Sequence, residues 1–494
     1  MIYTLYLTNK DGFGDEGNAI YMSGYQIYAL LLTISSIGIP NAIAKLISEK
    51  NSIKDYINRD RILKISLIIF GTVGFVSGIF LWKFSSFLAN NILEIPKSTL
   101  SLKVLSPAIF FVSISAVLRG YSNGNDKIEI TAKSQILEQI VKSFLTISLV
   151  EVISRKNSNT ELLACFANLA TTIATFISLI YIINRSFYIE KNVGRQPFQI
   201  EKTKNIMKKI LNISIPITLC SIFGVMCKNI DSITVVKILK RIVGEKDAVI
   251  RYGILSSKID LLIALPLSFN NSITTAIVPE ISKLKAKNKV NEIANKIEFS
   301  ILITFIICIP YCFGILFYSK EIIELLFPKA IRGAELLKIS CFSLVFSALI
   351  QTINSSLQGL GKNKIPLYIA IISTFLKLFF NIVLIPNKYL YEKGAIISTL
   401  ISNVIAFIIA FVYLNRNIKI NMKKMYIFKI MLNSSIMIFL SKILKIFLED
   451  IISQNRIITI LVICFSVSVY CYLLLFVKKM QKFKKSKILE NTEL

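Results

Sequence analysis

The sequence predicts an all-α polytopic membrane protein, and three observations lead to this fold class. Of the 494 residues, 54% are apolar, and the mean hydropathy is +0.64. Apolar runs of about 20 residues, long enough to cross a hydrocarbon core of about 30 Å as a helix, recur along most of the chain. These runs are continuous, as in residues 62–82, whereas the strands of a transmembrane β-barrel alternate between polar and apolar residues.

Thirteen apolar runs are expected to span the membrane, with short loops between them. The expected spans are 19–44, 62–82, 101–119, 134–153, 161–183, 211–227, 252–279, 299–318, 339–357, 366–386, 394–414, 427–446 and 457–477. Lysine and arginine indicate the orientation, because cytoplasmic loops carry an excess of both. Every second loop, counted from the loop 45–64, belongs to a first set, which together with the tail 478–487 holds 34 lysines and arginines. The loops between them hold 20. The first set, and with it the C-terminus, is predicted to be cytoplasmic.

Charge, cysteine and histidine content exclude several function classes. The net charge of +29 lies mainly in loops that flank the spans, so no nucleic-acid partner is expected. The eight cysteines lie mostly in apolar runs without a C-x-x-C pair, which is typical of core residues rather than disulfides or metal ligands. The chain has no histidine, so the commonest metal ligand and the usual proton carrier at neutral pH are absent. We expect no metal site, and we also expect no cofactor. The outer loops are too short to carry the acidic site of a membrane glycosyltransferase, so we expect no enzyme.

Two loops resemble each other and predict two related halves. Residues 119–127 read RGYSNGNDK and residues 358–366 read QGLGKNKIP. Each is a glycine-rich turn on the predicted cytoplasmic side, followed by a helix with a lysine near its middle, Lys142 or Lys377. Two parallel halves are typical of transporters that rock about a central cavity. The alternative is chance similarity in a chain rich in isoleucine and lysine.

Pro40 predicts a break in the first span. Proline removes a backbone donor and clashes with the preceding turn, so the helix bends or opens. Within a bilayer such a break is tolerated only where protein or a water-filled cavity satisfies the freed carbonyl. Gly38 is expected to ease the bend, and Lys45 is expected near the cytoplasmic mouth of such a cavity. The alternative is a simple kink, with the Lys45 side chain extended so that its ammonium lies at the membrane–water interface.

Three lysines, Lys142, Lys258 and Lys377, lie inside expected spans. A cation at the bilayer centre costs at least about 2.5–3.5 kcal/mol on insertion scales, so each is expected to face a partner or a hydrated cavity. Glu138 lies four residues before Lys142, where an ion pair along the helix is expected. Lys377 has no acidic residue at that spacing, but Asn381 lies four residues after it.

The span around Lys258 carries further polar residues. Asp260 is two residues away and therefore points to a different helix face, so it cannot simply neutralise Lys258. The polar run 268–272 follows, between two prolines. The candidates from this span are Arg251, Lys258, Asp260 and Asn270 for substrate binding, and Pro266 and Pro279 for helix breaks.

Several motifs, in order along the chain, resemble those of the multidrug/oligosaccharidyl-lipid/polysaccharide exporter superfamily. The similar branch contains polysaccharide-biosynthesis proteins, stage V sporulation protein B and the lipid II flippases. The motifs are GDEGNAIYMSGYQIY (14–28), GIPNAIAKLISEK (38–50), EQIVK (138–142), LPLSFNNSITTAIVPEIS (265–282), LQGLGKNKIP (357–366) and FLKLFFNIVLIP (375–386). They cover nearly the whole chain.

The resemblance implies two helical lobes in a V around a central cavity, followed by two further helices. It implies an N-terminal lobe over 1–190, a C-terminal lobe over 191–418, two additional helices over 419–480 and a basic cytoplasmic tail over 481–494. The thirteen spans then correspond to helices two to fourteen of the family. We therefore expect that a first helix is missing, through a misplaced start or a truncated chain.

The resemblance also implies a function, a monomeric flippase of the bacterial cytoplasmic membrane. The implied cargo is an undecaprenyl-(di)phosphate-linked saccharide, a cell-wall precursor or a polysaccharide repeat unit, moved to the outer leaflet by alternating access. In the family a basic residue before the proline of the eighth helix contacts the anionic substrate, which implies Lys258. Lysines and amides would replace the hydration of the phosphate.

Energy for this movement would come from the membrane potential, Na⁺ or H⁺, since no ATPase motif is present. An inside-negative potential favours outward movement of a negative head group by about 2.3 kcal/mol per charge per 100 mV. The sequence leaves open a cation-coupled multidrug exporter, which would need buried acids such as Asp260 and Glu138, and a non-transporting scaffold.

Overall fold

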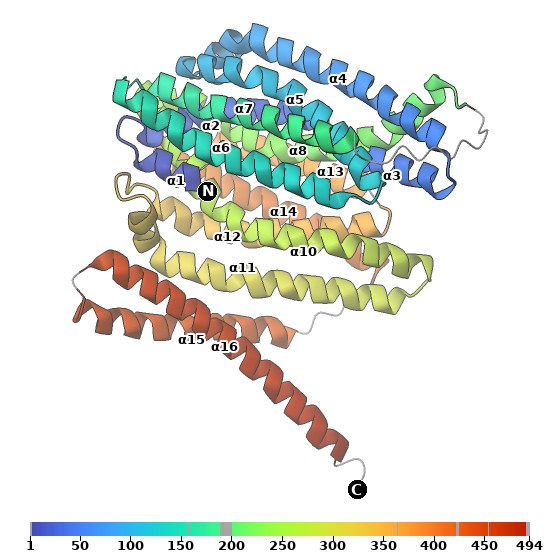
Figure 1. Ribbon diagram of the computed structural model, residues 1–494. Helices are drawn as coiled ribbons and strands as arrows, with labels where there is room; N and C mark the ends of the chain where they lie inside the picture. The colour runs from blue at the N-terminus through green and yellow to red at the C-terminus, as the bar shows by residue number, and fades with distance from the viewer. Residues whose placement is uncertain are drawn as a thin grey trace. The chain divides into compact units, whose positions relative to one another are not determined.

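The computed structural model describes residues 2–156, 159–187, 200–362, 364–420, 424–452 and 454–490, and this described part is helical without a strand. The all-α fold class is therefore confirmed (Figure 1). The helices are α1 (Ile2–Asn9), α2 (Gly14–Leu32), α3 (Ile39–Ser52), α4 (Tyr56–Phe87), α5 (Thr99–Gly124), α6 (Ile128–Lys156), α7 (Thr160–Phe187), α8 (Thr203–Val243), α9 (Glu245–Gly253), α10 (Asp260–Ala286), α11 (Val290–Leu326), α12 (Ala334–Gly359), α13 (Lys364–Leu384), α14 (Glu392–Asn417), α15 (Lys424–Glu449) and α16 (Asn455–Glu490). Short π-helical segments are η1 (Thr33–Ile37), η2 (Leu88–Ile92) and η4 (Ile254–Ile259), and η3 (Pro96–Ser98) is a 3₁₀ turn.

Ten helices of the described part are long and apolar enough to cross a membrane. They include α4, α5, α7 and α11–α15, together with the segments Glu245–Lys285 and Asn455–Leu474. The other three expected spans lie in α2–α3, α6 and α8, which are long helices but are not among these ten. The protein is therefore a polytopic membrane protein, and the number of thirteen spans stays a prediction.

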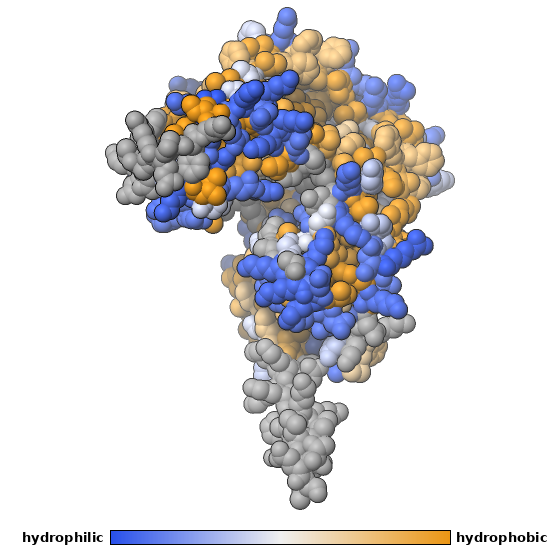
Figure 2. Space-filling view, turned by 90° about the vertical axis from the view of Figure 1, so that its right-hand side faces the viewer, coloured by the Kyte–Doolittle hydropathy of each residue, from blue (hydrophilic) through white to orange (hydrophobic). Residues whose placement is uncertain are grey.

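The α4 helix shows the surface that such a protein presents to lipid. Its residues Phe75, Val76, Phe80 and Trp82 are each 45–64% exposed. The top of Figure 2, where α4 lies, is correspondingly hydrophobic. An exposed apolar face of this extent would be unfavourable in water, whereas acyl chains can cover it in a bilayer.

The chain divides into two compact units, each of which is described by itself. Unit 1 comprises Met1–Leu261 and Asn363–Ser398, and unit 2 comprises Leu262–Lys362 and Thr399–Leu494. In unit 1, α5 packs against α2, α4 and α7, and α6 packs against α7 (Figure 1). In unit 2, α11 packs against α12, α15 and α16. The expected lobes over 1–190 and 191–418 stay a prediction.

Glycines allow close helix contacts at similar places in the two sequence repeats. A Cβ on Gly120, the second residue of the first repeat near the end of α5, would lie 2.9 Å from Ile43 Cβ and 2.9 Å from the Pro40 carbonyl of α3. A Cβ on Gly359, at the end of α12, would lie 2.9 Å from Ile281 Cβ of α10. Each glycine-rich turn thus follows a helix end that lies against its neighbour, which supports the repeat seen in the sequence.

The expected break at Pro40 is present as a π-helical segment, η1, which joins α2 to α3. Pro40 lies in the first turn of α3, where its missing N–H leaves no hydrogen bond unmade. Gly38 has a different role from the one expected. Its φ of −74° is open to any residue, but an added Cβ would lie 2.6 Å from the Ser214 carbonyl of α8. Gly38 therefore allows close packing rather than bending.

A polar cluster fixes the turn between α3 and α4 outside the expected spans. Asp55 accepts hydrogen bonds from Asn58 N at 3.1 Å and from Lys50 Nζ at 2.9 Å. Lys50 also pairs with Glu201. Burial by itself raises the pKa of Asp55, but the hydrogen bonds from Asn58 and Lys50 outweigh it and hold this pKa below its usual value. Hydrogen bonds from Lys209 and Lys50 also lower the pKa of Glu201.

Acid is expected to weaken this cluster. A carboxyl whose pKa is lowered by folding adds stability above its unfolded pKa, about 4, and this stability is lost as the pH falls through the folded pKa. The Tm of the detergent-purified protein should therefore fall in acid, and it should fall less for Asp55→Asn. Asp126→Asn, in the exposed α5–α6 turn, is the control for removing a surface carboxyl. An unchanged acid dependence in Asp55→Asn would contradict this assignment.

Candidate functional site

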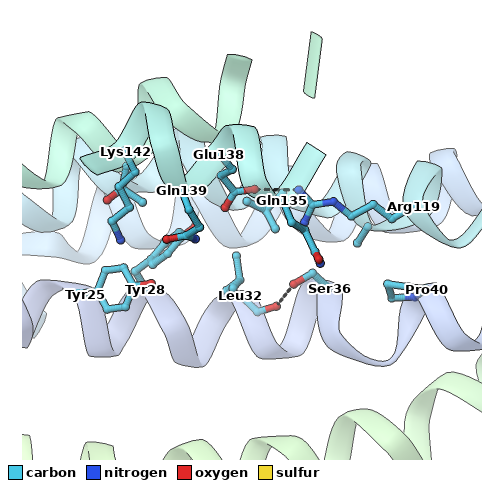
Figure 3. Close-up of a pocket in the computed structure, with 13 residues that line it drawn as sticks. Tyr25, Tyr28, Leu32, Ser36, Pro40, Arg119, Gln135, Glu138, Gln139 and Lys142 are labelled. Carbon is cyan, nitrogen blue, oxygen red and sulfur yellow. Dashed lines mark hydrogen bonds and ion pairs between the residues drawn. The ribbon is translucent and has the colours of Figure 1, made fainter. Parts of the chain in front are cut away.

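The candidate site is a pocket inside unit 1, between α2 and α6 (Figure 3). Its volume is about 320 Å³. The lining side chains come from α2, η1, α3, α5, α6 and α7, and they are Tyr25, Tyr28, Leu32, Ser36, Pro40, Val112, Ala116, Arg119, Gln135, Glu138, Gln139, Lys142 and Thr171. Two sequence-predicted residues, Lys142 and Pro40, thus lie at the same pocket.

Lys142 presents a positive charge to this pocket. Its side chain is only 3% exposed, and its ammonium lies 4.3 Å from the ring centroid of Tyr25 and 5.2 Å from that of Tyr3. In Figure 3 it points from α6 toward the tyrosines of α2. Among the described residues, no carboxylate pairs with it and no acceptor takes a hydrogen bond from it. Cation–π contacts, worth about 2 kcal/mol when desolvated, leave this charge without a counter-ion.

The expected ion pair between Glu138 and Lys142 is wrong. Glu138 Oε2 lies 2.8 Å from Arg119 Nη2 of α5, as the dashed line in Figure 3 shows. The same guanidinium donates to Ser134 Oγ and to Ser178 Oγ, at 3.1 Å each. A guanidinium with several acceptors holds a carboxylate more firmly than a flexible ammonium does. Arg119 and Glu138 therefore neutralise each other, and the charge of Lys142 remains.

The remaining polar groups give the pocket its binding capacity. Gln135 and Gln139 are exposed and contribute amides from α6. The Thr171 hydroxyl, on a residue that is 4% exposed, has no hydrogen-bond partner in the described part of the chain. The rings of Tyr25 and Tyr28 have centroids 5.6 Å apart. Aromatic faces with a few polar groups are typical of small-ligand sites.

Lys258 lies elsewhere in unit 1, where it forms an ion pair with Asp15 that joins η4 to α2. The lysine is 0% exposed, and its ammonium lies 2.7 Å from Asp15 Oδ1. A Cβ on Gly253 would lie 2.0 Å from the Asp15 carbonyl, so only glycine fits there. In this structure the Asp15 carboxylate neutralises the Lys258 ammonium. The predicted contact of Lys258 with substrate therefore stays a prediction.

Lys377 and Asn381 are brought together by an acidic residue of α8. Lys377, 4% exposed, lies 2.6 Å from Asp231 Oδ2. Asn381 Nδ2 donates to Asp231 Oδ1 at 3.0 Å and to Thr234 Oγ1 at 2.8 Å. This cluster joins α13 to α8, so these two candidates hold helices together in this structure.

The other predicted residues lie apart from the pocket. Arg251 pairs with Glu392. Lys45 is exposed and is 4.0 Å from Glu49, and Asp260 is half-buried at the start of α10. Asn270, in unit 2, donates to Gln351 and accepts from Thr304. Pro266 and Pro279 both lie within the bounds of α10, and the irregular segment η4 precedes them.

Two pocket residues that the sequence analysis missed, Gln135 and Gln139, share one helix face with Glu138 and Lys142, which it had named. Gln135, Glu138, Gln139 and Lys142 are spaced by three, one and three residues, which is the period of a helix face. This polar stripe within an expected span could have indicated the pocket. The contributions of Tyr25, Tyr28, Arg119 and Thr171 depend on packing between helices, for which one sequence holds no signal.

Known proteins are similar to most of the chain. The model of the family described as polysaccharide biosynthesis protein matches residues 1–285, and that of the MatE family matches residues 216–383. Stage V sporulation protein B of Bacillus subtilis is 29% identical over 291 residues, which are 58% of this chain and 55% of that relative. The chain thus spans about half the length of that protein. Lipid II flippase MurJ of the same organism is 24% identical over 432 residues, 82% of this chain and 77% of the relative.

Two solved structures share the fold. The inward closed conformation of a lipid II flippase MurJ has a TM-score of 0.70 at 19% identity, over 97% of this chain and 96% of that one. An inward-facing multidrug resistance MATE family transporter of the MOP superfamily has a TM-score of 0.70 at 13% identity, over 84% of this chain and 93% of that one. Because the first family model covers more than half of the residues, the chain belongs to the polysaccharide biosynthesis protein family, within the multidrug/oligosaccharidyl-lipid/polysaccharide exporter superfamily of membrane transporters.

Proposed function

We propose that the protein flips a saccharide linked to a polyprenyl phosphate or diphosphate from the inner to the outer leaflet of the cytoplasmic membrane. The observation that carries this proposal is the pocket within the helical part of unit 1, where Lys142 has no counter-ion among the described residues. The family and the similarity to a lipid II flippase support the same class of cargo.

The physical difficulty in flipping such a lipid is its head group. Phosphates and hydroxyls lose hydration when they leave water, at a large cost in free energy. A cationic residue, amides and hydroxyls inside the spanning region can replace part of that hydration. The polyprenyl tail needs no such help, because it stays in the hydrocarbon. Movement of a negative head group toward the outside is favoured by the inside-negative membrane potential, by about 2.3 kcal/mol per charge per 100 mV.

A cation-coupled multidrug exporter is the second candidate, because the MatE family model matches residues 216–383. The pocket argues against this alternative. Its charged residues are Arg119, Glu138 and Lys142, whose formal charges add to one positive, and such a lining repels a cationic drug. A strain without its own drug exporters should therefore accumulate ethidium equally with and without this chain. Lower ethidium accumulation with the chain would favour the exporter.

Growth rescue tests the proposed function. The chain is expressed in bacteria depleted of their lipid II flippase, and in parallel in bacteria that lack a flippase for a polysaccharide repeat unit. We expect rescue in one of the two strains. We also expect Lys142→Met to abolish it, because an anionic head group then meets a pocket whose remaining charges cancel.

Lys133→Met is the matched control, since this lysine lies on the same helix but is exposed and paired with Glu129. It should rescue as the wild type does. Failure of the wild-type chain in both strains, despite its presence in the membrane, would contradict the proposed function.

A further inference from the structure

We propose that unit 1 binds an anionic glycerophospholipid in a groove between α4 and α5, with the lipid phosphate on Lys83 and Lys103. The occupant is a lipid of the surrounding bilayer rather than the transported cargo, so the inference does not depend on the proposed function. The groove shares no lining residue with the pocket around Lys142.

The groove is an apolar hollow of about 300 Å³ between the two helices. Along α4 it is lined by Phe75, Gly78, Ile79 and Trp82, whose spacing of three, one and three residues places them on one helix face. Along α5 it is lined by Ser106, Pro107 and Phe110. The large side chains of α4 here are 48–60% exposed, so they face the surrounding lipid. An acyl chain can therefore reach the groove from the bilayer.

Two local features of the sequence shape the groove. A Cβ on Gly78 would lie 2.8 Å from the Ser106 carbonyl, so glycine at this position lets α4 lie directly against α5. Pro107 has no N–H for the Lys103 carbonyl one turn before it, and the Ser106 hydroxyl donates to this carbonyl at 2.6 Å instead. Because the freed carbonyl has a donor within the protein, the wall of the groove needs no water at membrane depth.

The length of the groove suits one acyl chain. At one end the rings of Phe75 and Phe110 meet edge to face, with centroids 5.9 Å apart. From Phe75 to Lys83, α4 rises by about 12 Å, since each helical residue adds about 1.5 Å. One leaflet of the hydrocarbon core is about 15 Å deep, half of the whole core. The groove thus runs along most of the depth of one leaflet.

Two lysines lie one turn beyond the other end of the groove. Lys83 follows Ile79 by four residues, and Lys103 precedes Pro107 by four, so both lie on the helix faces that line the groove. Both lysines are exposed, and neither forms an ion pair within the described part of the chain. Trp82, the only tryptophan of the sequence, precedes Lys83, and tryptophan is enriched at the membrane–water interface. A phosphate at this level of the membrane is attracted by both lysines.

These features favour a glycerophospholipid with a net negative charge. Such a lipid has its phosphate at the interface and its acyl chains in the hydrocarbon, which matches two lysines next to an apolar groove. The acyl chain gains little on entering the groove, because lipid and groove are about equally apolar. Selectivity therefore comes from the head group. Phosphatidylglycerol should be preferred over phosphatidylcholine, whose own cation offsets its phosphate.

Trp82 provides the test, because all tryptophan fluorescence of the chain comes from the groove. The full chain is placed in phosphatidylcholine nanodiscs, and a minor share of the lipid is replaced by phosphatidylglycerol or phosphatidylcholine with brominated acyl chains, which quench tryptophan on contact. We expect brominated phosphatidylglycerol to quench at about three- to tenfold lower content than brominated phosphatidylcholine. Equal quenching by the two lipids would overturn the inference.

Substitution of the lysines separates this site from the general attraction between a basic protein and an anionic lipid. Lys83→Gln with Lys103→Gln should remove the preference, whereas Lys83→Arg with Lys103→Arg should keep it, because the positive charges remain. The matched control is Lys97→Gln with Lys237→Gln, which removes two lysines of unit 1 that each pair with a glutamate outside the groove. This control should keep the preference. A preference that survives in the first variant, or that the control loses to the same degree, would contradict the site.

Two further readouts identify the lipid and its place. Unlabelled polyprenyl phosphate is added to nanodiscs with brominated phosphatidylglycerol, and Trp82 should stay quenched. Recovery of its fluorescence would identify a polyprenyl carrier as the occupant and overturn the assignment to a bilayer lipid. Phosphatidylglycerol added to the protein in detergent should raise the Tm of the wild type, because a bound ligand stabilises the folded state. An equal rise for Lys83→Gln with Lys103→Gln would show that the lipid binds elsewhere.

Discussion

Asp15→Ala lowers the free energy of unfolding by an expected 3–5 kcal/mol, roughly the cost of breaking a buried ion pair from one side. The reason is Lys258, which is 0% exposed and has the Asp15 carboxylate 2.7 Å from its ammonium. After the substitution this carboxylate is gone, while the lysine stays buried between η4 and α2. Thermal unfolding of the purified protein in detergent measures the effect as a lower Tm.

Two further variants separate the buried charge from a general weakness of the α2 N-terminus. Adding Lys258→Met to Asp15→Ala should restore most of the stability, because replacing both partners of a buried pair by apolar groups is often neutral or better. Glu16→Ala removes the neighbouring acid, whose pair with Lys97 is exposed, and should cost about 0–1 kcal/mol. Equal losses in Asp15→Ala and Glu16→Ala would contradict the account.

Asp231→Ala is expected to have an effect of similar size, about 3–5 kcal/mol. Its carboxylate lies 2.6 Å from Lys377 Nζ and accepts from Asn381 Nδ2 at 3.0 Å, so α8 and α13 both lose their shared polar contact. Asp231→Asn keeps an acceptor for Asn381 but no charge, and it should lie between the wild type and Asp231→Ala. The same measurement of Tm ranks these variants.

The matched control for Asp231 is Glu245→Ala. Glu245 lies 3.2 Å from Lys240, and both side chains are at least one third exposed, so its loss should cost about 0–1 kcal/mol. The double variant Asp231→Ala with Lys377→Met should recover much of the lost stability. A double variant that is less stable than Asp231→Ala would show that Lys377 stabilises the helices without its carboxylate, against our interpretation.

The fold class was predictable because hydrophobic length is a local property. Long apolar runs indicate spanning helices whatever their neighbours are, and Pro40 indicated the irregular segment that is found at η1. The role of Gly38 in close helix packing was not predictable. It depends on the backbone of Ser214, in α8, and helix-to-helix distances leave no pattern in one sequence.

The candidate site was predictable only in part, for the same reason. A lysine inside an apolar span is costly to insert into the membrane, so its presence alone indicates a partner or a binding site. Lys142, Lys258 and Lys377 could be identified in this way. Their partners were not, because Asp15 is 243 residues from Lys258, and Asp231 is 146 residues from Lys377. Spacing along one helix suggested Glu138 as the partner of Lys142, but Glu138 forms its ion pair with Arg119 of α5 instead.

Transbilayer movement in proteoliposomes tests the central claim most directly. The purified chain is reconstituted, and the passage of a short-chain polyprenyl diphosphate saccharide between leaflets is followed by its accessibility to an external enzyme. We expect movement with the wild type, with Lys142→Arg and with Lys133→Met, and loss of movement with Lys142→Met. Equal rates for wild-type and Lys142→Met liposomes, or no movement with the wild type under an inside-negative potential, would contradict the account.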